Sequence, residues 1–263
     1  MLVMRNGASN GERAIPEETA IAFTYGSTTF AVMMATPEDV EDFAFGFSLT
    51  EGIINAPSEI ASIEVIPHKQ GVEARMILAV ERDEQLVSRR RRLAGPAGCG
   101  LCGIESLEAA TRPTRKVQTN WRTKVTTIFE AVSRLREHQR LHAETKAVHA
   151  AGFWSLAENG FMGVREDVGR HNALDKLAGA LARADIDPAS GFIVLSSRLS
   201  IELVQKAATI GCPMLVAVSA PTNFALRAAE AAGMTLIAVA REDAFEIFTH
   251  PHRAITAAPD ESG

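Results

Sequence analysis

Alternating hydrophobic and polar residues near the start of the chain predict a β-hairpin and two further strands. The runs 20–25 and 28–34 are strand-like and are separated by Gly26-Ser27, which fits a two-residue turn. Two more strand-like runs follow at 62–66 and 72–80. We therefore expect a small sheet in this part of the chain.

A helix is expected between these two pairs of strands. Thr36 is predicted as its N-cap and Pro37 as its first residue, with the acidic Glu38 and Asp39 in the first turn. Gly52 is a candidate C-cap. Apolar residues recur at helical spacing between these ends: Val40, Phe43, Ala44 and Phe47.

The second half of the chain has the pattern of alternating helices and buried strands. Residues 121–141 predict an amphipathic helix, and Asn172 is predicted as the N-cap of a later one. That later helix is expected at 172–183. It is followed by predicted strands at 192–195, 213–218 and 234–240, which alternate with helices near 200–210 and near 222–232. Such alternation predicts a parallel sheet covered by helices.

Open parallel sheets bind ligands beyond the carboxyl ends of their strands. Three polar loops follow the predicted strands at that edge: Ser196-Ser197-Arg198, Ser219-Ala220-Pro221-Thr222 and Arg241-Glu242-Asp243. Hydroxyl groups and arginines beside helix N-termini suit an anionic, nucleotide-like ligand. The sequence therefore predicts such a site at this edge.

The composition is that of a globular protein. Of the 263 residues, 46% are hydrophobic and 22% are charged, which argues against a disordered or fibrous protein. The net charge of −5 argues against general nucleic-acid binding. Because no apolar run suits a signal peptide or a membrane span, we expect a cytoplasmic protein that does not enter the membrane. Three cysteines are too few for a disulfide framework, so their thiols are expected to be reduced.

Cys99 and Cys102 form a C-x-x-C pair inside the glycine-rich segment 98–103. Such a pair can form a disulfide, contribute to a zinc site with two histidines, or act as reactive thiols. The four arginines at 89–92 favour the thiolate and therefore the reactive pair. Cys212 lies in an apolar context and is expected to fill the core.

Other polar residues have competing interpretations. His142 and Glu144 form the H-x-E of zinc deaminases, but the C-x-x-C precedes it here, which argues against such a centre. His149 lies among small apolar residues and is expected to be a hydrogen-bonded core residue. The polar segment 166–176 straddles a predicted helix N-terminus. It fits either a binding or catalytic role or a structural network of ion pairs.

Several motifs together resemble the FdhD/NarQ family. They are C-G-L-C-G, V-H-A-A, E-D-V-G-R-H-N-A-L-D-K, S-S-R-L-S-I-E-L-V-Q-K and V-S-A-P-T, in this order. T-P-E-D-V-E-D-F-A-F-G-F-S-L-T-E-G-I-I precedes them and T-H-P-H-R follows them, so the resemblance covers roughly residues 15–255. The E-D-V-G-R-H-N-A-L-D-K block is the most specific of these motifs.

The resemblance implies a sulfurtransferase, a sulfur carrier required for formate dehydrogenase activity. Members of the family accept sulfur from a cysteine desulfurase as a cysteine persulfide. They deliver it to the molybdenum cofactor, bis-molybdopterin guanine dinucleotide, before this cofactor enters formate dehydrogenase. The resemblance also implies a homodimer, and a cofactor bound as a client with no metal held by protein side chains.

Matching motifs imply which residues take part. Cys99 would carry the persulfide, and Cys102 matches the second cysteine of the motif. The cofactor-binding stretch of the family corresponds to Val239, Ala240, Arg241, Glu242, Asp243 and Ala244. Further candidate ligand residues come from the polar loops and from the segment 166–176: Ser197, Arg198, Ser219, Thr222, Arg170 and His171.

Two stretches depart from the family pattern. Val239 stands where an aromatic residue is usual, and Glu242-Asp243 where a glycine and neutral residues are common. Acidic residues that face a diphosphate would be unfavourable. Lys146-Ala147 replaces the usual Gly-Gly, so either these residues adopt a backbone that glycine takes more easily or the turn differs.

We therefore expect an α/β protein with two parts. Residues 1–115 would form a smaller N-terminal α+β subdomain that ends in the cysteine loop, and 111–120 supply a linker. Residues 116–263 would form a three-layer α/β/α domain, which the resemblance implies is similar to cytidine deaminases. Two rival functions remain: a non-catalytic molybdenum-cofactor chaperone and a zinc-dependent deaminase.

Overall fold

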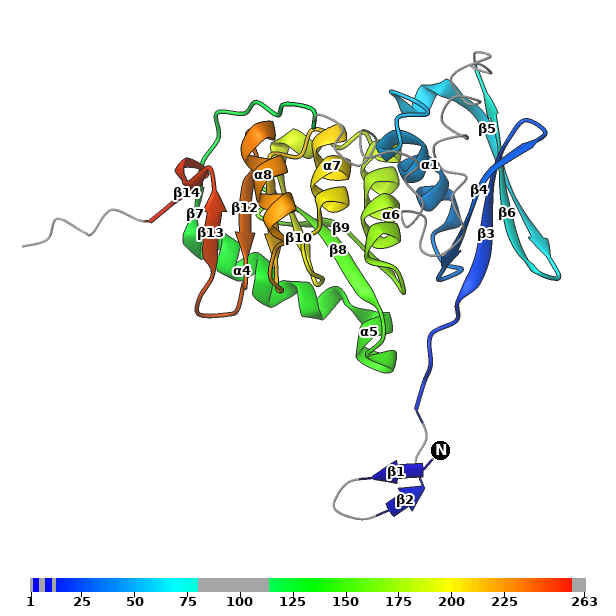
Figure 1. Ribbon diagram of the computed structural model, residues 1–263, viewed down its shortest axis with the longest axis horizontal. Coiled ribbons are helices and arrows are strands. Elements are labelled where there is room, and N and C mark those ends of the chain that lie inside the picture. The colour runs from blue at the N-terminus through cyan, green and yellow to red at the C-terminus, as the bar shows by residue number, and fades with distance from the viewer. Residues whose placement is uncertain (1, 5–7, 11–12, 80–113, 257–263) are drawn as a thin grey trace, which may run out of the picture.

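The computed structural model contains a four-stranded sheet in the first part of the chain and a six-stranded sheet in the second (Figure 1). It describes residues 2–4, 8–10, 13–79 and 114–256. Cys99 and Cys102 lie outside the described residues, as does the arginine run at 89–92. The boundary between 115 and 116 therefore stays a prediction.

The four-stranded sheet has the order β4-β3-β6-β5, with β3 and β6 parallel and the other neighbours antiparallel. Its strands are β3 (Thr19–Tyr25), β4 (Thr28–Ala35), β5 (Ile60–His68) and β6 (Gly71–Leu78), and this confirms the predicted hairpin and both later strands. Helix α1 (Val40–Thr50) covers one face, where Phe23 stacks on Phe47 at 4.5 Å. A separate hairpin near the N-terminus pairs β1 (Leu2–Met4) with β2 (Ala8–Asn10).

The predicted start of α1 at Thr36 is wrong. The helix begins at Val40, with Asp39 as the N-cap. Thr36 is buried, and its backbone N–H donates to Asp167 Oδ2 at 3.0 Å while its hydroxyl accepts from the N–H of Val168 at 3.2 Å. Because partners more than a hundred residues away use these groups, they are not available to cap the helix. At the other end, Gly52 takes a left-handed conformation directly after the C-cap, as glycine can.

The six-stranded sheet has the order β13-β12-β11-β10-β8-β9. Its strands along the chain are β8 (His149–Ser155), β9 (Gly160–Asp167), β10 (Gly191–Leu195), β11 (Met214–Ala217), β12 (Thr235–Ala238) and β13 (Glu246–Thr249). The strands β10, β11 and β12 are parallel, as predicted. The other three pair antiparallel, so the whole sheet is mixed and the expectation of a parallel sheet is only partly correct. The turns between β8 and β9 and between β12 and β13 are short, and short turns can join only antiparallel neighbours.

Helices cover both faces of this sheet and give three layers (Figure 1). One face packs against α6 (Arg170–Arg183), α7 (Ile201–Thr209) and α8 (Asn223–Ala232). The other packs against α4 (Val125–Leu135). The short elements that remain are β7 (Thr123–Lys124), β14 (Ala254–Ile255), and the 3₁₀ turns η1 (Pro57–Glu59), η3 (Pro188–Ser190) and η4 (Pro251–Arg253). Among the described residues, none of the helices has both the length and the apolar character of a membrane span.

The single helix predicted over 121–141 is wrong. The segment divides into α4, the 3₁₀ turn η2 (Arg136–His138) and α5 (Arg140–Thr145). Gln139 has a non-helical backbone, with φ −92° and ψ 69°, and this allows the chain to change direction. The break matters because α5 lies beside the cavity described below.

Two further predictions concern single residues. The N-cap of α6 is Gly169 and not Asn172, whose amide donates instead to the Met34 carbonyl and to Asp167 Oδ1, both at 2.9 Å. The prediction for Cys212 is confirmed: it is fully buried, and burial raises the pKa of its thiol to about 12. At this pKa it stays a thiol at neutral pH.

Helices α1 and α6 join the two sheets and lie in backbone contact. A Cβ added at Gly46 would lie 1.6 Å from the carbonyl oxygen of Asp175, and one added at Gly179 would lie 1.8 Å from that of Asp42. Neither position can therefore hold a larger residue without separating the helices. Ion pairs from Arg165 and Arg183 to Asp42 bind the same helix from outside.

Candidate functional site

A cavity of about 820 Å³ lies at the carboxyl ends of the three parallel strands. Ser196 follows β10 and Val218 follows β11, while Ala240 lies two residues after β12, and all three line the cavity. Its volume is in the range of small-molecule sites in proteins. The cavity therefore lies where open α/β sheets bind their ligands.

The opposite wall comes from the other helical layer and from the start of β8. Its residues are Val132 and Leu135 of α4, Arg136 of η2, then Gln139, His142 of α5, and the run Lys146, Ala147, Val148 and His149. Apolar side chains and basic groups thus face the same space. Such a lining suits a flat organic ring that carries an anionic group.

The turn between β12 and β13 supplies the remaining wall. Ala240, Arg241, Glu242 and Asp243 line the cavity, so four of the six predicted residues of this stretch meet there. Val239 packs against the core with φ +53°, a left-handed conformation that a β-branched residue rarely adopts. Ala244 closes the turn, because its carbonyl accepts from the N–H of Arg241 at 2.8 Å.

Arg241 is held by the ends of two strands. Its guanidinium donates to the carbonyls of Val218 and Ala240. These two hydrogen bonds use the N–H groups of one guanidinium nitrogen, Nη1, and hold the side chain at the edge of the sheet. Arg241 therefore contributes a positioned positive charge to the cavity wall.

Glu166 holds α5 against the cavity. Its carboxylate accepts from the N–H groups of Leu141 at 2.7 Å and His142 at 2.9 Å, which are free donors at the start of that helix. The helix ends at Thr145, and its C-cap Lys146 has φ +58°. Of the two residues that replace the usual Gly-Gly, Lys146 therefore adopts a backbone that glycine takes more easily, whereas Ala147 does not have a positive φ.

His149 lines the cavity, so its prediction as a hydrogen-bonded core residue is wrong. It is the first residue of β8 and is half-buried. Burial lowers the pKa of its imidazole, and the positive charges of Arg170, His142 and Arg198 lower it further. The imidazole is therefore neutral at neutral pH and lies in a positive field.

Four of the predicted ligand residues in the polar loops do not line the cavity. The hydroxyl of Ser197 is turned to the carbonyl of Arg198, and Arg198 itself is exposed. The carbonyl of Ser219 accepts from Val239, and Thr222 is the N-cap of α8. Ser196 lines the cavity in place of its neighbour, since successive residues at a strand end point in opposite directions.

Arg170 and His171, at the start of α6, also lie away from the cavity lining. The imidazole of His171 is 3.3 Å from the hydroxyl of Ser200 and 3.8 Å from the carboxylate of Glu202. Burial lowers the pKa of His171 to about 4, with further contributions from Arg170 and Lys206. The Nε of Arg170 is buried and has no hydrogen-bond partner among the described residues.

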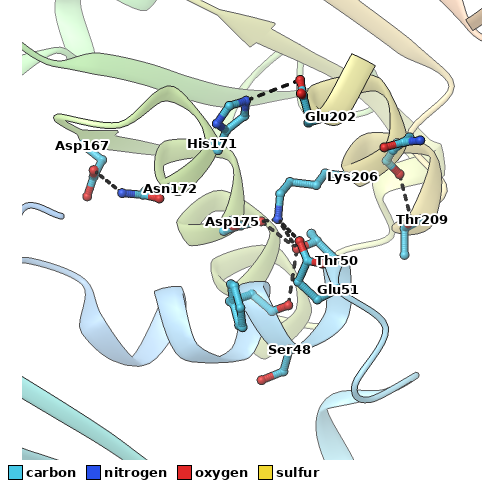
Figure 2. A network of polar contacts seen from close by, with 12 residues as sticks. Ser48, Thr50, Glu51, Asp167, His171, Asn172, Asp175, Glu202, Lys206 and Thr209 are labelled. Carbon is cyan, nitrogen blue, oxygen red and sulfur yellow. Dashed lines mark hydrogen bonds and ion pairs between the residues drawn. The ribbon is translucent and has the colours of Figure 1, made fainter. Parts of the chain in front are cut away.

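Three residues of the segment 166–176 take part in buried ion pairs: Asp167 pairs with Lys176, and Asp175 pairs with Lys206, the latter shown in Figure 2. Lys206 Nζ donates to Asp175 at 2.9 Å, Glu51 at 2.8 Å and the Thr50 hydroxyl at 3.0 Å, which joins α7, α6 and the end of α1. Burial raises the pKa of Asp175 to about 6. Burial alone would lower the pKa of Lys206, but Asp175 and Glu51 outweigh it and raise the pKa to about 12. The segment 166–176 therefore forms the structural network of ion pairs that was one of its two interpretations.

The H-x-E pair lies on α5. The imidazole Nδ1 of His142 is 3.1 Å from the Val148 carbonyl, and Glu144 is exposed. Within the described ranges, no group of three or more His, Cys, Asp or Glu side chains could hold a metal ion. Because Cys99 and Cys102 lie outside those ranges, the expected absence of a protein-bound metal stays a prediction.

The fold and the cavity define an α/β protein with a ligand-sized site at the carboxyl edge of its larger sheet. A family model described as the FdhD/NarQ family matches residues 16–255. The chain belongs to this family, and the resemblance seen in the motifs is confirmed.

Relatives of the chain share most of its length. It is 51% identical over 255 residues to the sulfur carrier protein FdhD of Agrobacterium fabrum, across 96% of this chain and 93% of the relative. The protein of the same name from Brucella abortus is 48% identical over 251 residues, across 95% and 93%. A crystal structure described as a formate dehydrogenase accessory protein from Desulfotalea psychrophila matches with a TM-score of 0.79 over 97% of both chains. At 24% identity, this match supports the mixed α/β fold.

Proposed function

We propose that the chain carries sulfur as a persulfide on Cys99 and transfers it to a molybdenum cofactor that bears guanine nucleotides. In this proposal the cofactor is bis-molybdopterin guanine dinucleotide, and it receives sulfur before it enters formate dehydrogenase. One guanine nucleotide end occupies the cavity at the sheet edge. The sulfur donor is a cysteine desulfurase.

The observation that carries this proposal is the name sulfur carrier protein, borne by relatives that match almost the whole chain. The sequence supplies a thiol pair suited to the chemistry at Cys99 and Cys102. The cavity supplies apolar walls together with the basic groups of Lys146 and Arg241. These features fit a base and its phosphates, respectively.

The proposed chemistry has two steps. The Cys99 thiolate attacks the terminal sulfur of the donor persulfide, whose S–S bond breaks as the donor cysteine leaves as a thiolate. The Cys102 thiolate then attacks the inner sulfur of the Cys99 persulfide, and the terminal sulfur leaves as sulfide towards molybdenum. The two cysteines are oxidised to a disulfide and the transferred sulfur is reduced to sulfide, so the electrons balance.

We also propose the domain type, the oligomeric state and the cellular location of the protein. The part formed by residues 116–263 is deaminase-like, an assignment that the three layers and the helix-covered mixed sheet support. The protein works as a cytoplasmic homodimer and holds no metal with its own side chains. Formate dehydrogenase is the final recipient of the cofactor.

Mass spectrometry after incubation with a cysteine desulfurase and cysteine tests the sulfur step. We expect the peptide that contains residues 99–102 to gain about 32 Da, the mass of one sulfur atom. Cys99→Ala should abolish the gain, whereas the matched variant Cys102→Ala should form the persulfide and retain it. A Cys99→Ala protein that still restores formate dehydrogenase activity to cells lacking the wild type would refute the assignment. Absence of any adduct on the wild type would favour a chaperone without thiol chemistry.

A further inference from the structure

Basic side chains gather where β13 leads into β14, at the end of the six-stranded sheet opposite to the cavity (Figure 1). Strand β13 runs antiparallel to β12, so its last residue pairs near the start of β12, whereas the cavity lies beyond the end of β12. The basic residues of this cluster are Arg122, His250, His252 and Arg253.

Arg253 is a buried arginine without a carboxylate partner. The residue is 4% exposed, and its guanidinium has one hydrogen bond among the described residues, from Nη1 to the Thr235 hydroxyl at 3.1 Å. Its Nε is buried and has no partner in the described part of the chain. Burial lowers the pKa of the guanidinium, and no carboxylate opposes this effect. Because a buried charge without a counter-charge is costly, Arg253 is suited to hold an anion.

Two neighbouring basic groups extend the positive charge from Arg253 to the surface. Strand β14 pairs with β7 in parallel, and this register brings Arg122 beside Arg253. Arg122 is exposed and has no hydrogen bond or ion pair with any described residue. His252 is also exposed. Partial burial of its ring lowers its pKa, and the positive charges of Arg253, His250 and Arg122 lower it further.

His250 and Glu230 limit the cluster on the side of α8. The imidazole Nε2 of His250 is 3.0 Å from the backbone carbonyl of Glu230 and 3.7 Å from its carboxylate. Within the described ranges, this carboxylate forms no ion pair with Arg122 or Arg253. The two guanidinium groups therefore keep their positive charge without compensation from α8.

We propose that Arg253, Arg122 and His252 form a binding site for a phosphate group, separate from the cavity. Two guanidinium groups match the charge of roughly −2 that a phosphate group carries near neutral pH. Their N–H groups form forks that fit phosphate oxygens, and a neutral imidazole can donate a third hydrogen bond.

The length of β12 separates this site from the cavity. Thr235, which contacts Arg253, and Ala240, which lines the cavity, are five residues apart along the strand direction. At about 3.3 Å per residue this is about 16 Å. A phosphate at Arg253 therefore does not compete with a ligand in the cavity.

NMR of the full chain with isotope-labelled histidines tests the site, because the His252 signal reports on this cluster. His252→Gln identifies that signal by its loss. We expect inorganic phosphate to shift the His252 signal saturably and to raise its pKa, since an opposite charge favours the imidazolium. Sodium chloride and sodium acetate at equal ionic strength should produce much smaller shifts.

Glycerol phosphate distinguishes two sources of the phosphate group. Binding at least as tight as that of inorganic phosphate would indicate that the site takes the phosphate of a larger ligand. Binding of inorganic phosphate alone would indicate the free ion. Either result supports the site.

Variants of single residues make the result specific. Arg253→Met should weaken phosphate binding by about tenfold or more, because charge-assisted hydrogen bonds are lost. Arg122→Gln should weaken it as well, and it changes an exposed residue outside the core. Lys69→Gln removes an exposed cation in the turn between β5 and β6 and should leave the affinity unchanged. Lys146→Gln removes a basic group of the cavity and should also leave the His252 response unchanged.

Three outcomes would overturn the proposal. A His252 shift no larger with phosphate than with chloride, or undiminished in both arginine variants, would remove the site. Equal binding of acetate would refute the assignment to phosphate. Loss of the response in Lys146→Gln would show that the ion binds in the cavity and that no separate site exists.

Discussion

Lys176 Nζ lies 2.7 Å from Asp167 Oδ2, and neither side chain is exposed to solvent. The same ammonium donates to the carbonyl of Thr36 at 2.8 Å, and the same carboxylate accepts from the Thr36 N–H at 3.0 Å. The pair therefore joins α6 and β9 to the segment that leads into α1. Removal of one partner leaves the other charge buried without compensation.

We expect Lys176→Met to destabilise the protein by about 3–5 kcal/mol, because the buried carboxylate loses its counter-charge. Urea denaturation followed by circular dichroism measures the change in free energy of unfolding. Glu158→Gln, at an exposed position in the turn between β8 and β9, is the matched control and should change stability by less than about 0.5 kcal/mol. An equally small effect of Lys176→Met would show that the pair does not stabilise the contact of α6 and β9 with the segment that leads into α1.

The close backbone contact between α1 and α6 should make the protein sensitive to larger residues at Gly46 and Gly179. A methyl group at Gly46 or Gly179 would overlap the backbone of the facing helix, and backbone atoms cannot move aside as a flexible side chain can. Gly46→Ala should therefore cost at least about 1–3 kcal/mol, the usual range for overpacking. Gly160→Ala is the control, since its nearest neighbour would be 3.8 Å from the added Cβ. Similar thermal midpoints for the two variants would contradict this account.

The buried His171 should make stability depend on pH. Its pKa is lowered to about 4, first by burial and then by Arg170 and Lys206, against 6.5 for an ordinary histidine. Protons then bind more tightly to the unfolded chain, so His171 costs stability as the pH falls from 6.5 towards 4. The loss should approach about 1.4 kcal/mol per pH unit in that window.

His171→Gln removes this titration while it keeps a polar side chain. The difference between wild type and variant in free energy of unfolding, measured at pH 7, 6 and 5, isolates the histidine from other titrating groups. We expect the variant to lose less stability than the wild type on acidification. Parallel curves would exclude a neutral, buried His171.

His149 should couple anion binding to proton uptake. Burial and the charges of Arg170, His142 and Arg198 lower the pKa of His149, so the free protein holds it neutral near pH 7. A phosphate in the cavity would raise that pKa, because an opposite charge favours the imidazolium. GDP binding should therefore tighten as the pH falls below 7, and His149→Gln should flatten this dependence. Calorimetry in buffers of different ionisation enthalpy would measure the protons taken up, and no uptake by the wild type would contradict the prediction.

Local sequence patterns predicted the elements well wherever neighbours along the chain decide the structure. The hairpin around Gly26-Ser27, the buried face of α1 and the three parallel strands follow from turn chemistry and hydrophobic periodicity. Both capping predictions failed for one reason. The Thr36 hydroxyl accepts from the N–H of Val168, and the Asn172 amide donates to Asp167 and to the Met34 carbonyl, so tertiary contacts use both side chains.

The same distinction holds for the candidate site. The sequence by itself determined the family, the cysteine pair and the polar turn at 240–243, because each is a continuous motif. Only the tertiary structure decided that His149, Lys146 and Ser196 share a cavity with that turn, and that Asp175 and Lys176 stabilise the fold through buried ion pairs. The physical reason is that burial and charge pairing depend on distances in space, and these are set by how α1, α6 and the six-stranded sheet pack together.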